Sequence, residues 1–380
     1  MSARHLRRNG PCYAMVAGGG TAGHVLPALA IAEALVAAGH PRETIAMVGS
    51  ARGLEAKLYP EAGFPVTLLP GRGIERKLSV QNLRSAFALF QALFRAWRLV
   101  GKLRPKVIVS VGGYASQAVG QAAASRRVPI VVAEQNAAPG AANRWVGRFA
   151  KACAVSFPDT ALPRAVVTGN PVRPEIAAID RPGDTETARH KLDVYPGRRV
   201  VLVMGGSLGA LKVNKAVLSA LPRWASRTDL HIRHVVGRRD WDLIAGGEPP
   251  LAPGTPLRYQ AVEYEDDMAT ALAAADVVVC RSGSSTCFEL LAAGLASVLV
   301  PSPNVTADHQ TANARHMAAT GAAVVVPDRE LTGERLVSEV DGLLFGDPQR
   351  LHAMARAAKA AARPHAAHDI AALAQEHARA

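Results

Sequence analysis

The chain has 380 residues, of which 49% are hydrophobic and 20% charged, a composition typical of a globular protein long enough for two domains. It has no run of about 18 uncharged apolar residues, which excludes a membrane-spanning helix, and its basic N-terminus has no apolar stretch that would make a signal peptide. The cysteines, Cys12, Cys153, Cys280 and Cys287, form no Cys-x-x-Cys pair, so we expect free thiols in a reducing compartment and no structural zinc site.

Positive charge is concentrated in the first half of the chain. Residues 1–175 carry 22 Lys and Arg against 8 Asp and Glu, whereas the remainder carries 22 against 23. The first half is therefore expected to meet a negatively charged surface, and the second half is not.

Short apolar runs alternate with helical patterns through the first half. Strands are expected at 13–17, 44–48, 66–69, 107–111, 130–133 and 152–155. This alternation predicts a parallel sheet covered by helices on both faces. The prolines and glycine of 166–174, VVTGNPVRP, predict a hinge.

The first expected strand runs directly into three glycines, Gly18, Gly19 and Gly20, and then into a helix over 25–37. A strand, a glycine turn and a helix N-terminus are typical of phosphate binding, because glycine allows close approach and free N–H groups favour an anion. His24 lies at the mouth of this turn as a titratable candidate.

The Gly18, Gly20 and Gly23 spacing also matches G-x-G-x-x-G, which alone is a weak signal. The next strand ends in Gly49 and Ser50 instead of the acidic residue that would hold the ribose of a dinucleotide, so a nicotinamide cofactor is disfavoured. No G-K-[ST] follows, which excludes a P-loop.

Two further turns follow strands in this half, at 111–120 (VGGYASQAVG) and 133–136 (AEQN). Turns after parallel strands leave one edge of the sheet, so both should face His24. Glu134 has two interpretations: it orients His24, or it caps the helix that includes Asn143.

The segment 71–106 is basic and amphipathic, with nine Lys and Arg and one acid, Glu75. One interpretation is a core-facing helix with a solvated charged face. The other is a membrane-facing patch whose aromatic residues enter lipid while its cations meet anionic headgroups. Its members would be Arg84, Phe87, Phe90, Phe94, Arg95, Trp97 and Arg98. Nucleic acid would also suit the charge, but no recognition motif accompanies it.

The second half restarts the same pattern. Strands are expected at 199–204, 232–236, 257–260, 277–280, 297–300 and 323–326, with a glycine turn at 205–209 and a helix from 212. Two such units in tandem predict an α/β fold of two Rossmann-like parallel-sheet domains separated by a ligand cleft. We expect domains at 1–170 and 171–350 and a helical tail at 351–380.

Two polar stretches of this half could bind a ligand. The first, 281–289 (RSGSSTCFE), leads into a helix expected over 288–293 and offers hydroxyl and N–H groups that suit a diphosphate. Glu289 there could accept hydrogen bonds from a ribose diol, or complement the dipole of a helix first turn. The second, 301–313, contains Asp308, His309 and Gln310, which could read sugar hydroxyls or lie in a surface loop.

These motifs, in this order, resemble the MurG family, which transfers N-acetylglucosamine (GlcNAc) from UDP-GlcNAc to undecaprenyl-linked lipid I to form lipid II for peptidoglycan. The resemblance runs through GGGTAGHVLPALAIAEAL, GGYAS, EQN, GNPVR, GGSLGA, the block from DDMATALAAADVVVC to RSGSSTCFE, and DHQTANA. It implies a GT-B fold, an inverting mechanism, a nucleotide held mainly by the C-terminal domain, and peripheral attachment to the cytoplasmic face of the plasma membrane.

The resemblance also implies the residues that bind UDP-GlcNAc. They are Thr21, Ala22, Gly23, Asn136, Arg173, Ser207, Ser284, Ser285, Thr286, Cys287, Phe288, Glu289 and Gln310. The sequence departs from the family's common residues at Ala22, Ala133, Leu208 and Glu265.

The expected chemistry has the C4 hydroxyl of the acceptor's N-acetylmuramic acid (MurNAc) attack the anomeric carbon while UDP leaves. His24 would be the general base, with Glu134 orienting it. The stretches that would hold the diphosphate contain no D-x-D pair, so no metal or other cofactor is expected. The alternatives are a related GT-B transferase with another lipid-linked or peptide acceptor, a UDP-GlcNAc 2-epimerase, and a non-enzymatic membrane or nucleic-acid binder.

Overall fold

The computed structural model describes residues 12–51, 53–70, 80–181, 183–206, 209–245 and 251–380, and only the backbone of residues 80–89 and 245. The chain divides into two compact units. Unit 1 is Met1–Val172 with His365–Ala380, and unit 2 is Arg173–Pro364. The ligand cleft expected between two domains depends on how the units are placed, and it stays a prediction.

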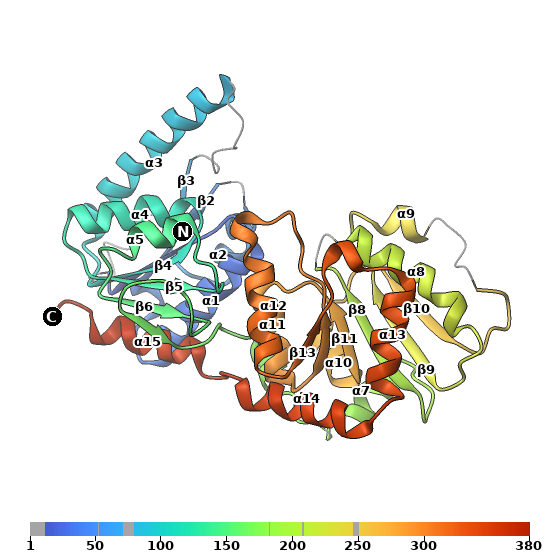
Figure 1. Cartoon of the computed structure of the whole chain (residues 1–380). Helices are drawn as coiled ribbons and strands as arrows, with labels where there is room; N and C mark the ends of the chain where they lie inside the picture. Colours follow the sequence, from blue (N-terminus) through green and yellow to red (C-terminus); the bar gives the residue numbers. More distant parts are fainter. Residues whose placement is uncertain (1–11, 52, 71–79, 182, 207–208, 246–250) are drawn as a thin grey trace. The chain divides into compact units, whose positions relative to one another are not determined.

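Unit 1 is built on a parallel sheet, seven-stranded over its described residues, in the order β3-β2-β1-β4-β5-β6-β7 (Figure 1). Its strands are β1 (Ala14–Gly18), β2 (Ile45–Ser50), β3 (Val66–Leu69), β4 (Val107–Gly112), β5 (Ile130–Glu134), β6 (Ala152–Val155) and β7 (Ala165–Val167). Every residue of β1, β2, β4, β5 and β6 is buried, as expected for parallel strands covered on both faces.

The helices of unit 1 cover both faces of this sheet. Residues of α3 (Val80–Leu103), α4 (Tyr114–Ser125) and α5 (Ala141–Val146) share one core cluster with it. Residues of α1 (Ala22–Ala37), α2 (Glu55–Glu61) and α15 (Ala366–Glu376) share the other. A short 3-10 helix, η1 (Arg42–Thr44), precedes β2.

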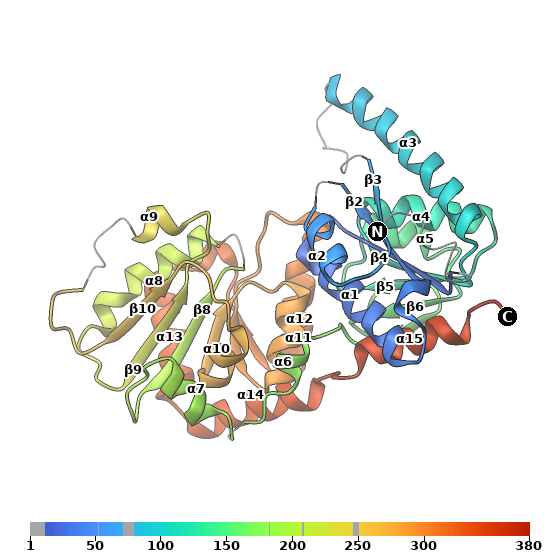
Figure 2. The same ribbon diagram turned by 180° about the vertical axis from the view of Figure 1, so that it is seen from behind.

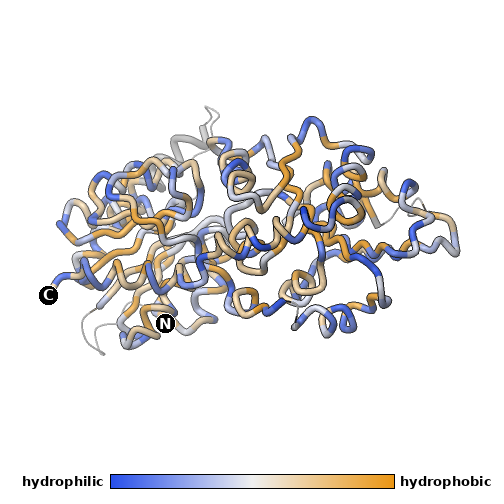
Figure 3. Tube along the Cα trace, turned by 60° about the horizontal axis from the view of Figure 1, so that its bottom comes forward, coloured by the Kyte–Doolittle hydropathy of each residue, from blue (hydrophilic) through white to orange (hydrophobic). Residues whose placement is uncertain are grey.

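Unit 2 repeats the architecture with a sheet, six-stranded in the described part of the chain, in the order β10-β9-β8-β11-β12-β13 (Figure 2). Its strands are β8 (Arg199–Met204), β9 (Leu230–Val235), β10 (Arg258–Val262), β11 (Val277–Cys280), β12 (Ala296–Leu299) and β13 (Ala323–Val325). The apolar strand segments run through the interior of each unit (Figure 3).

The α-helices and 3-10 helices of unit 2 lie between and after these strands. They are α6 (Pro174–Ala177), α7 (Thr185–Lys191), α8 (Leu211–Trp224), α9 (Trp241–Ala245), α10 (Met268–Ala274), α11 (Ser284–Ala293), η2 (Thr306–Asp308), α12 (His309–Ala319), η3 (Asp328–Glu330), α13 (Gly333–Leu344) and α14 (Pro348–Ala361). Helices α8 and α13 pack together over one face of the sheet.

The fold class predicted from the sequence is confirmed, with two differences in detail. The edge strand β7 was not predicted, because its three residues are exposed and two of them lie where a hinge was expected. The chain passes from unit 1 to unit 2 between Val172 and Arg173, within that same segment. The tail expected as a separate segment is divided, since α14 belongs to unit 2 and α15 returns to unit 1. The predicted free state of all four cysteines is confirmed, and all four are buried.

Candidate active site

Unit 1 reverses its strand order between β1 and β4. The turns after these strands leave the same sheet edge and touch: a side chain at Gly113, which has φ +88°, would overlap the carbonyl oxygen of Gly19. Open α/β sheets bind ligands at such a switch point. The two predicted glycine turns therefore form one candidate site.

His24 connects these two turns. It lies in the first turn of α1, and its Nδ1 is 3.1 Å from Oγ1 of Thr21, the N-cap residue. A Cβ at Gly112 would stand 2.9 Å from His24 Nε2 and 3.5 Å from Asn143 Nδ2. Because Gly112 also has φ +115°, this position requires a glycine. The structure therefore brings His24 to the second turn, as predicted, and adds Asn143 to the site.

Glu134 is buried beneath the loop that follows β5. Its carboxylate accepts hydrogen bonds from the N–H groups of Asn136 and Gly140, both at 3.0 Å, and from Asn143 Nδ2 at 3.0 Å. These are the contacts of a residue that holds the start of α5, the capping alternative. A further role for Glu134 in orienting His24 stays a prediction, with Asn143 as the residue that lies near both.

Unit 2 has its own switch point, between β8 and β11, which pair with Met204 opposite Cys280. The glycine turn after β8 and the segment from Arg281 after β11 therefore leave the sheet side by side. Of the predicted turn, Ser207 and Leu208 lie outside the described residues. Helix α11 begins at Ser284, earlier than the helix start expected at Phe288.

This earlier start changes what the first residues of α11 offer a ligand. Ser284, Ser285 and Thr286 form its first turn, where backbone N–H groups lack partners within the helix and favour an anion. Cys287 and Phe288 are buried, so their side chains hold the helix in place. Glu289 lies in the second turn, so its alternative interpretation as a first-turn acid is wrong.

Arg173 and Glu289, which the resemblance gave to different parts of the nucleotide, bind each other. Arg173 Nε donates to Glu289 Oε1 at 2.8 Å. Burial raises the pKa of the Glu289 carboxyl, and the Arg173 guanidinium opposes that rise. About a third of the Arg173 side chain is exposed, so a ligand can still reach this pair.

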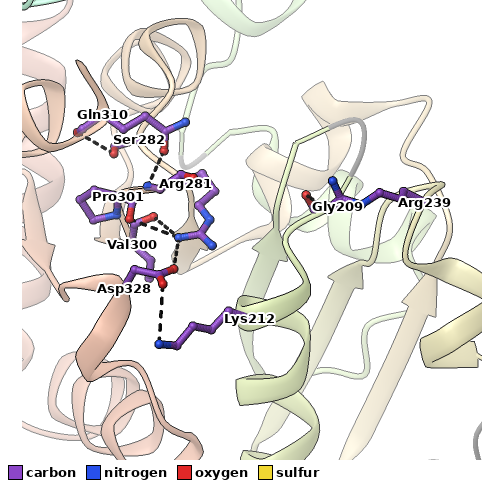
Figure 4. A network of polar contacts seen from close by, with 10 residues as sticks. Gly209, Lys212, Arg239, Arg281, Ser282, Val300, Pro301, Gln310 and Asp328 are labelled. Carbon is purple, nitrogen blue, oxygen red and sulfur yellow. Dashed lines mark hydrogen bonds and ion pairs between the residues drawn. The ribbon is translucent and has the colours of Figure 1, made fainter. Parts of the chain in front are cut away.

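Two cations share one carboxylate beside the unit 2 switch point (Figure 4). Arg281 Nη1 donates to Asp328 Oδ1 at 2.6 Å and to the carbonyl oxygens of Val300 and Pro301. Lys212, in the first turn of α8, places Nζ 3.6 Å from Asp328 Oδ2. No motif in the sequence marks Asp328, which follows β13 and lies far along the chain from both cations.

Gln310 ties the loop after β12 to the turn after β11. Its backbone oxygen accepts from Ser282 Oγ at 2.8 Å, and its Oε1 accepts from the Ser302 N–H at 2.8 Å (Figure 4). Within the part of the chain that the structure describes, Gln310 Nε2 keeps no hydrogen-bond partner. This amide can therefore donate to a sugar hydroxyl.

The turn after β8 is backed by a buried polar network. Asn214 Nδ2 donates to Val236 O at 3.0 Å and to Asp240 Oδ2 at 3.1 Å, and its Oδ1 is 3.0 Å from His234 Nε2. Burial lowers the pKa of His234 to about 4. Asp240 and Asp242 form a D-x-D sequence outside the expected diphosphate stretches, and Arg239 Nε also donates to Asp240, at 2.9 Å.

Helix α3 exposes its aromatic residues and buries its small ones. Phe90, Phe94 and Trp97 are 66%, 50% and 46% exposed, whereas Ala92 and Ala96 are fully buried. Arg98 lies over the Phe94 ring at 5.7 Å, and Arg126 lies over the Trp97 ring at 3.8 Å. The interpretation that puts these aromatics in the core is therefore wrong for Phe90, Phe94 and Trp97. The side chains of Arg84 and Phe87 lie outside the described residues.

Among the described residues, no helix has the length and apolar character needed to cross a bilayer. The N-terminal half of α3 projects beyond the neighbouring layers of unit 1 (Figures 1 and 2).

The two parallel-sheet units have the GT-B fold, and matches to two glycosyltransferase domains place the chain among the GT-B glycosyltransferases. Residues 14–155 match the glycosyltransferase family 28 N-terminal domain, and residues 200–370 match the family 28 C-terminal domain. A relative from Desulforudis audaxviator, a UDP-N-acetylglucosamine--N-acetylmuramyl-(pentapeptide) pyrophosphoryl-undecaprenol N-acetylglucosamine transferase, is 40% identical over 94% of this chain and 96% of its own.

Solved structures agree with these sequence matches. The crystal structure of MurG from Acinetobacter baumannii is 30% identical with a TM-score of 0.79, over 96% of this chain and 100% of that one. The chain belongs to the MurG family. A putative UDP-N-acetylglucosamine 2-epimerase from Listeria monocytogenes is 16% identical with a TM-score of 0.67, over 97% of each chain, and shares the fold alone.

Proposed function

We propose that this protein is an inverting N-acetylglucosaminyltransferase that moves GlcNAc from UDP-GlcNAc to the C4 hydroxyl of MurNAc in undecaprenyl-linked lipid I, and so forms lipid II. The observation that carries the proposal is the 40% identity, over nearly the whole chain, to a transferase named for this donor and acceptor. The glycine turns at both switch points support it, because a sugar nucleotide and a polar acceptor each need such a site.

In this proposal unit 1 supplies the general base. The acceptor hydroxyl gives its proton to His24 as its oxygen forms a bond to the anomeric carbon, and the bond from that carbon to UDP breaks on the opposite face, which inverts the configuration. The His24 ring suits this role, because Thr21 Oγ1 lies 3.1 Å from Nδ1 and Nε2 borders the space that Gly112 leaves by having no side chain. An imidazole takes up a proton near neutral pH.

Unit 2 holds the donor and stabilises the leaving group. The first-turn N–H groups of α11 and the Arg173 guanidinium would offset the charge that develops on the diphosphate. Gln310 Nε2 would donate to a GlcNAc hydroxyl, and Glu289 would accept from the ribose. Thr21, Ala22, Gly23 and Asn136 in unit 1 and Ser207 in unit 2 remain proposed donor contacts, and no metal is assigned to the site.

The protein works at the cytoplasmic face of the plasma membrane as a peripheral enzyme. Phe90, Phe94 and Trp97, exposed on α3 beside Arg95 and Arg98, form the expected contact with an anionic lipid surface, with Arg84 and Phe87 on the same helix. Aromatic side chains enter the interface and each cation contributes about 1 kcal/mol.

The test is an assay with radiolabelled UDP-GlcNAc and a short-chain lipid I analogue. Transfer of label to the acceptor, with release of UDP, supports the proposal. Labelled free sugar formed without acceptor would point to the epimerase alternative, and label moved only to another lipid would point to a related transferase. Intact UDP-GlcNAc that does not bind would leave only a membrane- or nucleic-acid-binding role.

A further inference from the structure

A buried carboxylate, Glu55, lies directly behind the first glycine turn. It is the first residue of α2 and is 0% exposed. Its Oε1 accepts three hydrogen bonds, from Gly20 N at 3.0 Å, Ser50 N at 3.0 Å and Ser50 Oγ at 2.7 Å. One oxygen thus joins the turn after β1 to the end of β2, and Glu55 itself lies 35 residues after Gly20 in the sequence.

Three glycines make room for this side chain. A Cβ at Gly19, at Gly49 or at Gly53 would overlap atoms of Glu55. Gly49 belongs to β2, Gly53 to the β2–α2 connection and Gly19 to the turn itself. Their absent side chains leave a space that Glu55 fills, so the carboxylate has little freedom to move away from Gly20.

A second side chain of α2 holds the other end of the same turn. Tyr59, one helical turn after Glu55, is buried and donates from its hydroxyl to Gly18 O at 2.9 Å. Helix α2 therefore binds the carbonyl at the start of the glycine turn and the N–H at its end. Residues four apart lie on one helix face, which is why a single short helix can make both contacts.

The segment held in this way leads directly to His24. Gly20, with φ +93°, precedes Thr21, and Thr21 is both the N-cap of α1 and the partner of His24 Nδ1. We propose that Glu55 is a positioning residue for His24, acting with Tyr59 through the glycine turn so that Thr21 and the imidazole keep one arrangement. The inference rests on the proposed function, in which His24 is the general base.

A simpler account makes Glu55 an acid that complements the dipole of α2. That account needs no partner outside the helix, whereas all three donors to Glu55 come from other segments. It also predicts no effect of Glu55 on the rate of transfer beyond its effect on stability. The two accounts therefore differ in an experiment on catalysis.

The experiment is a double-mutant cycle between Glu55→Ala and His24→Ala in the full chain, assayed with UDP-GlcNAc and a short-chain lipid I analogue. We expect Glu55→Ala to lower kcat about 10- to 100-fold, because small misplacements of a catalytic group have effects of this size. The KM for UDP-GlcNAc and the binding of UDP should change little. In the His24→Ala background the same change should have almost no further effect.

Conservative variants separate positioning from folding. Glu55→Gln keeps an acceptor oxygen for Gly20 and should regain most of the rate. Ser50→Ala removes one donor but leaves the bond to Gly20, and should stay within about threefold of wild type. If Glu55→Ala does not fold, as judged by circular dichroism and thermal unfolding of the full chain, Tyr59→Phe takes its place. We expect it to lose kcat several-fold, and this loss should likewise vanish in the His24→Ala background.

Three results would overturn the inference: a Glu55→Ala rate equal to wild type, a Ser50→Ala loss as large as that of Glu55→Ala, or equal fold-losses with and without His24. A Tyr59→Phe loss of kcat that is equally large with and without His24 would overturn it in the same way. No transfer by the wild-type chain would instead overturn the proposed function, and this inference with it.

Discussion

The two glycine turns of this protein follow equivalent strands, yet their surroundings carry opposite charge. The turn after β1 lies on a buried acid, Glu55, and presents a titratable side chain, His24. The segments after β8 and β11 are lined by cations, Lys212 and Arg281, which share Asp328. A similar sequence signal, glycines after an apolar strand, thus marks one site suited to proton transfer and another suited to a diphosphate.

This contrast shows that a glycine turn reports close backbone approach and not the ligand itself. What the turn binds is decided by groups behind it that come from distant segments. Variants that change one turn should therefore leave the function of the other intact, and the predictions below test that separation.

The largest effect is expected from His24→Ala. Loss of a general base lowers kcat about 10²- to 10⁴-fold, while UDP binding, measured by calorimetry, should be unchanged because unit 2 is intact. His352→Ala, at an exposed position of α14, serves as the control and should behave like wild type. Near-normal turnover of His24→Ala would remove His24 from its role.

The next effect concerns the proposed membrane face of unit 1. Changing Arg84, Arg95 and Arg98 to Glu should weaken binding to anionic vesicles about 100-fold, because each cation near the surface contributes about 1 kcal/mol. Turnover of a water-soluble acceptor should not change. The same reversal at Arg329, Arg350 and Arg363, exposed in unit 2, gives an equal net charge and should leave vesicle binding unaltered. Equal loss in both triple variants would contradict a specific membrane face.

Arg173→Ala tests the nucleotide side of the comparison. It leaves the buried Glu289 carboxyl without its 2.8 Å partner, which should lower the free energy of unfolding of unit 2 by about 1–3 kcal/mol. UDP affinity should fall about tenfold or more in Arg173→Ala. The affinity of Arg173→Lys should lie between those of Arg173→Ala and wild type. Wild-type UDP affinity in Arg173→Ala would exclude Arg173 from the diphosphate site.

Acid should destabilise unit 2 through two buried histidines. Burial lowers the pKa of His231 and of His234 to about 4, so between pH 6.5 and 4 the unfolded chain binds protons that the folded unit does not. As the pH falls through this range, the free energy of unfolding should therefore decrease by about 1.4 kcal/mol per pH unit for each histidine. Above pH 6.5 the full stability should be present. Denaturant unfolding at pH 7, 6 and 5 measures this slope, and His234→Gln should reduce it. A flat profile would mean that these histidines are not buried in neutral form.

The smallest effect is expected from metal removal. The stretches proposed to hold the diphosphate lack a D-x-D pair, and Asp240 of the one at 240–242 is bonded to Asn214 and Arg239. EDTA should leave turnover within twofold of the untreated enzyme. Activity that disappears with EDTA and returns only with Mg²⁺ would contradict this.

The sequence predicted the strands well because parallel strands buried on both faces are continuous apolar runs, as in β4 and β5. It could not place Glu55 or Asp328, whose partners lie far along the chain. It also left α3 ambiguous, because aromatic residues at helical spacing fit a core or a membrane face equally. In the structure Ala92 and Ala96 are buried while Phe90, Phe94 and Trp97 are exposed, which removes these three aromatics from the core and leaves the membrane face as a proposal.

The return of α15 to unit 1 has a consequence for how the protein is made. Ile370, Ala371 and Ala374 of α15 belong to the same core cluster as Ile31 and Leu35 of α1. During synthesis residues 366–376 must therefore leave the ribosome before the unit that was translated first can close its apolar surface. Until then the N-terminal half would keep that surface open to chaperones, and loss of α15 would damage the unit that was translated first.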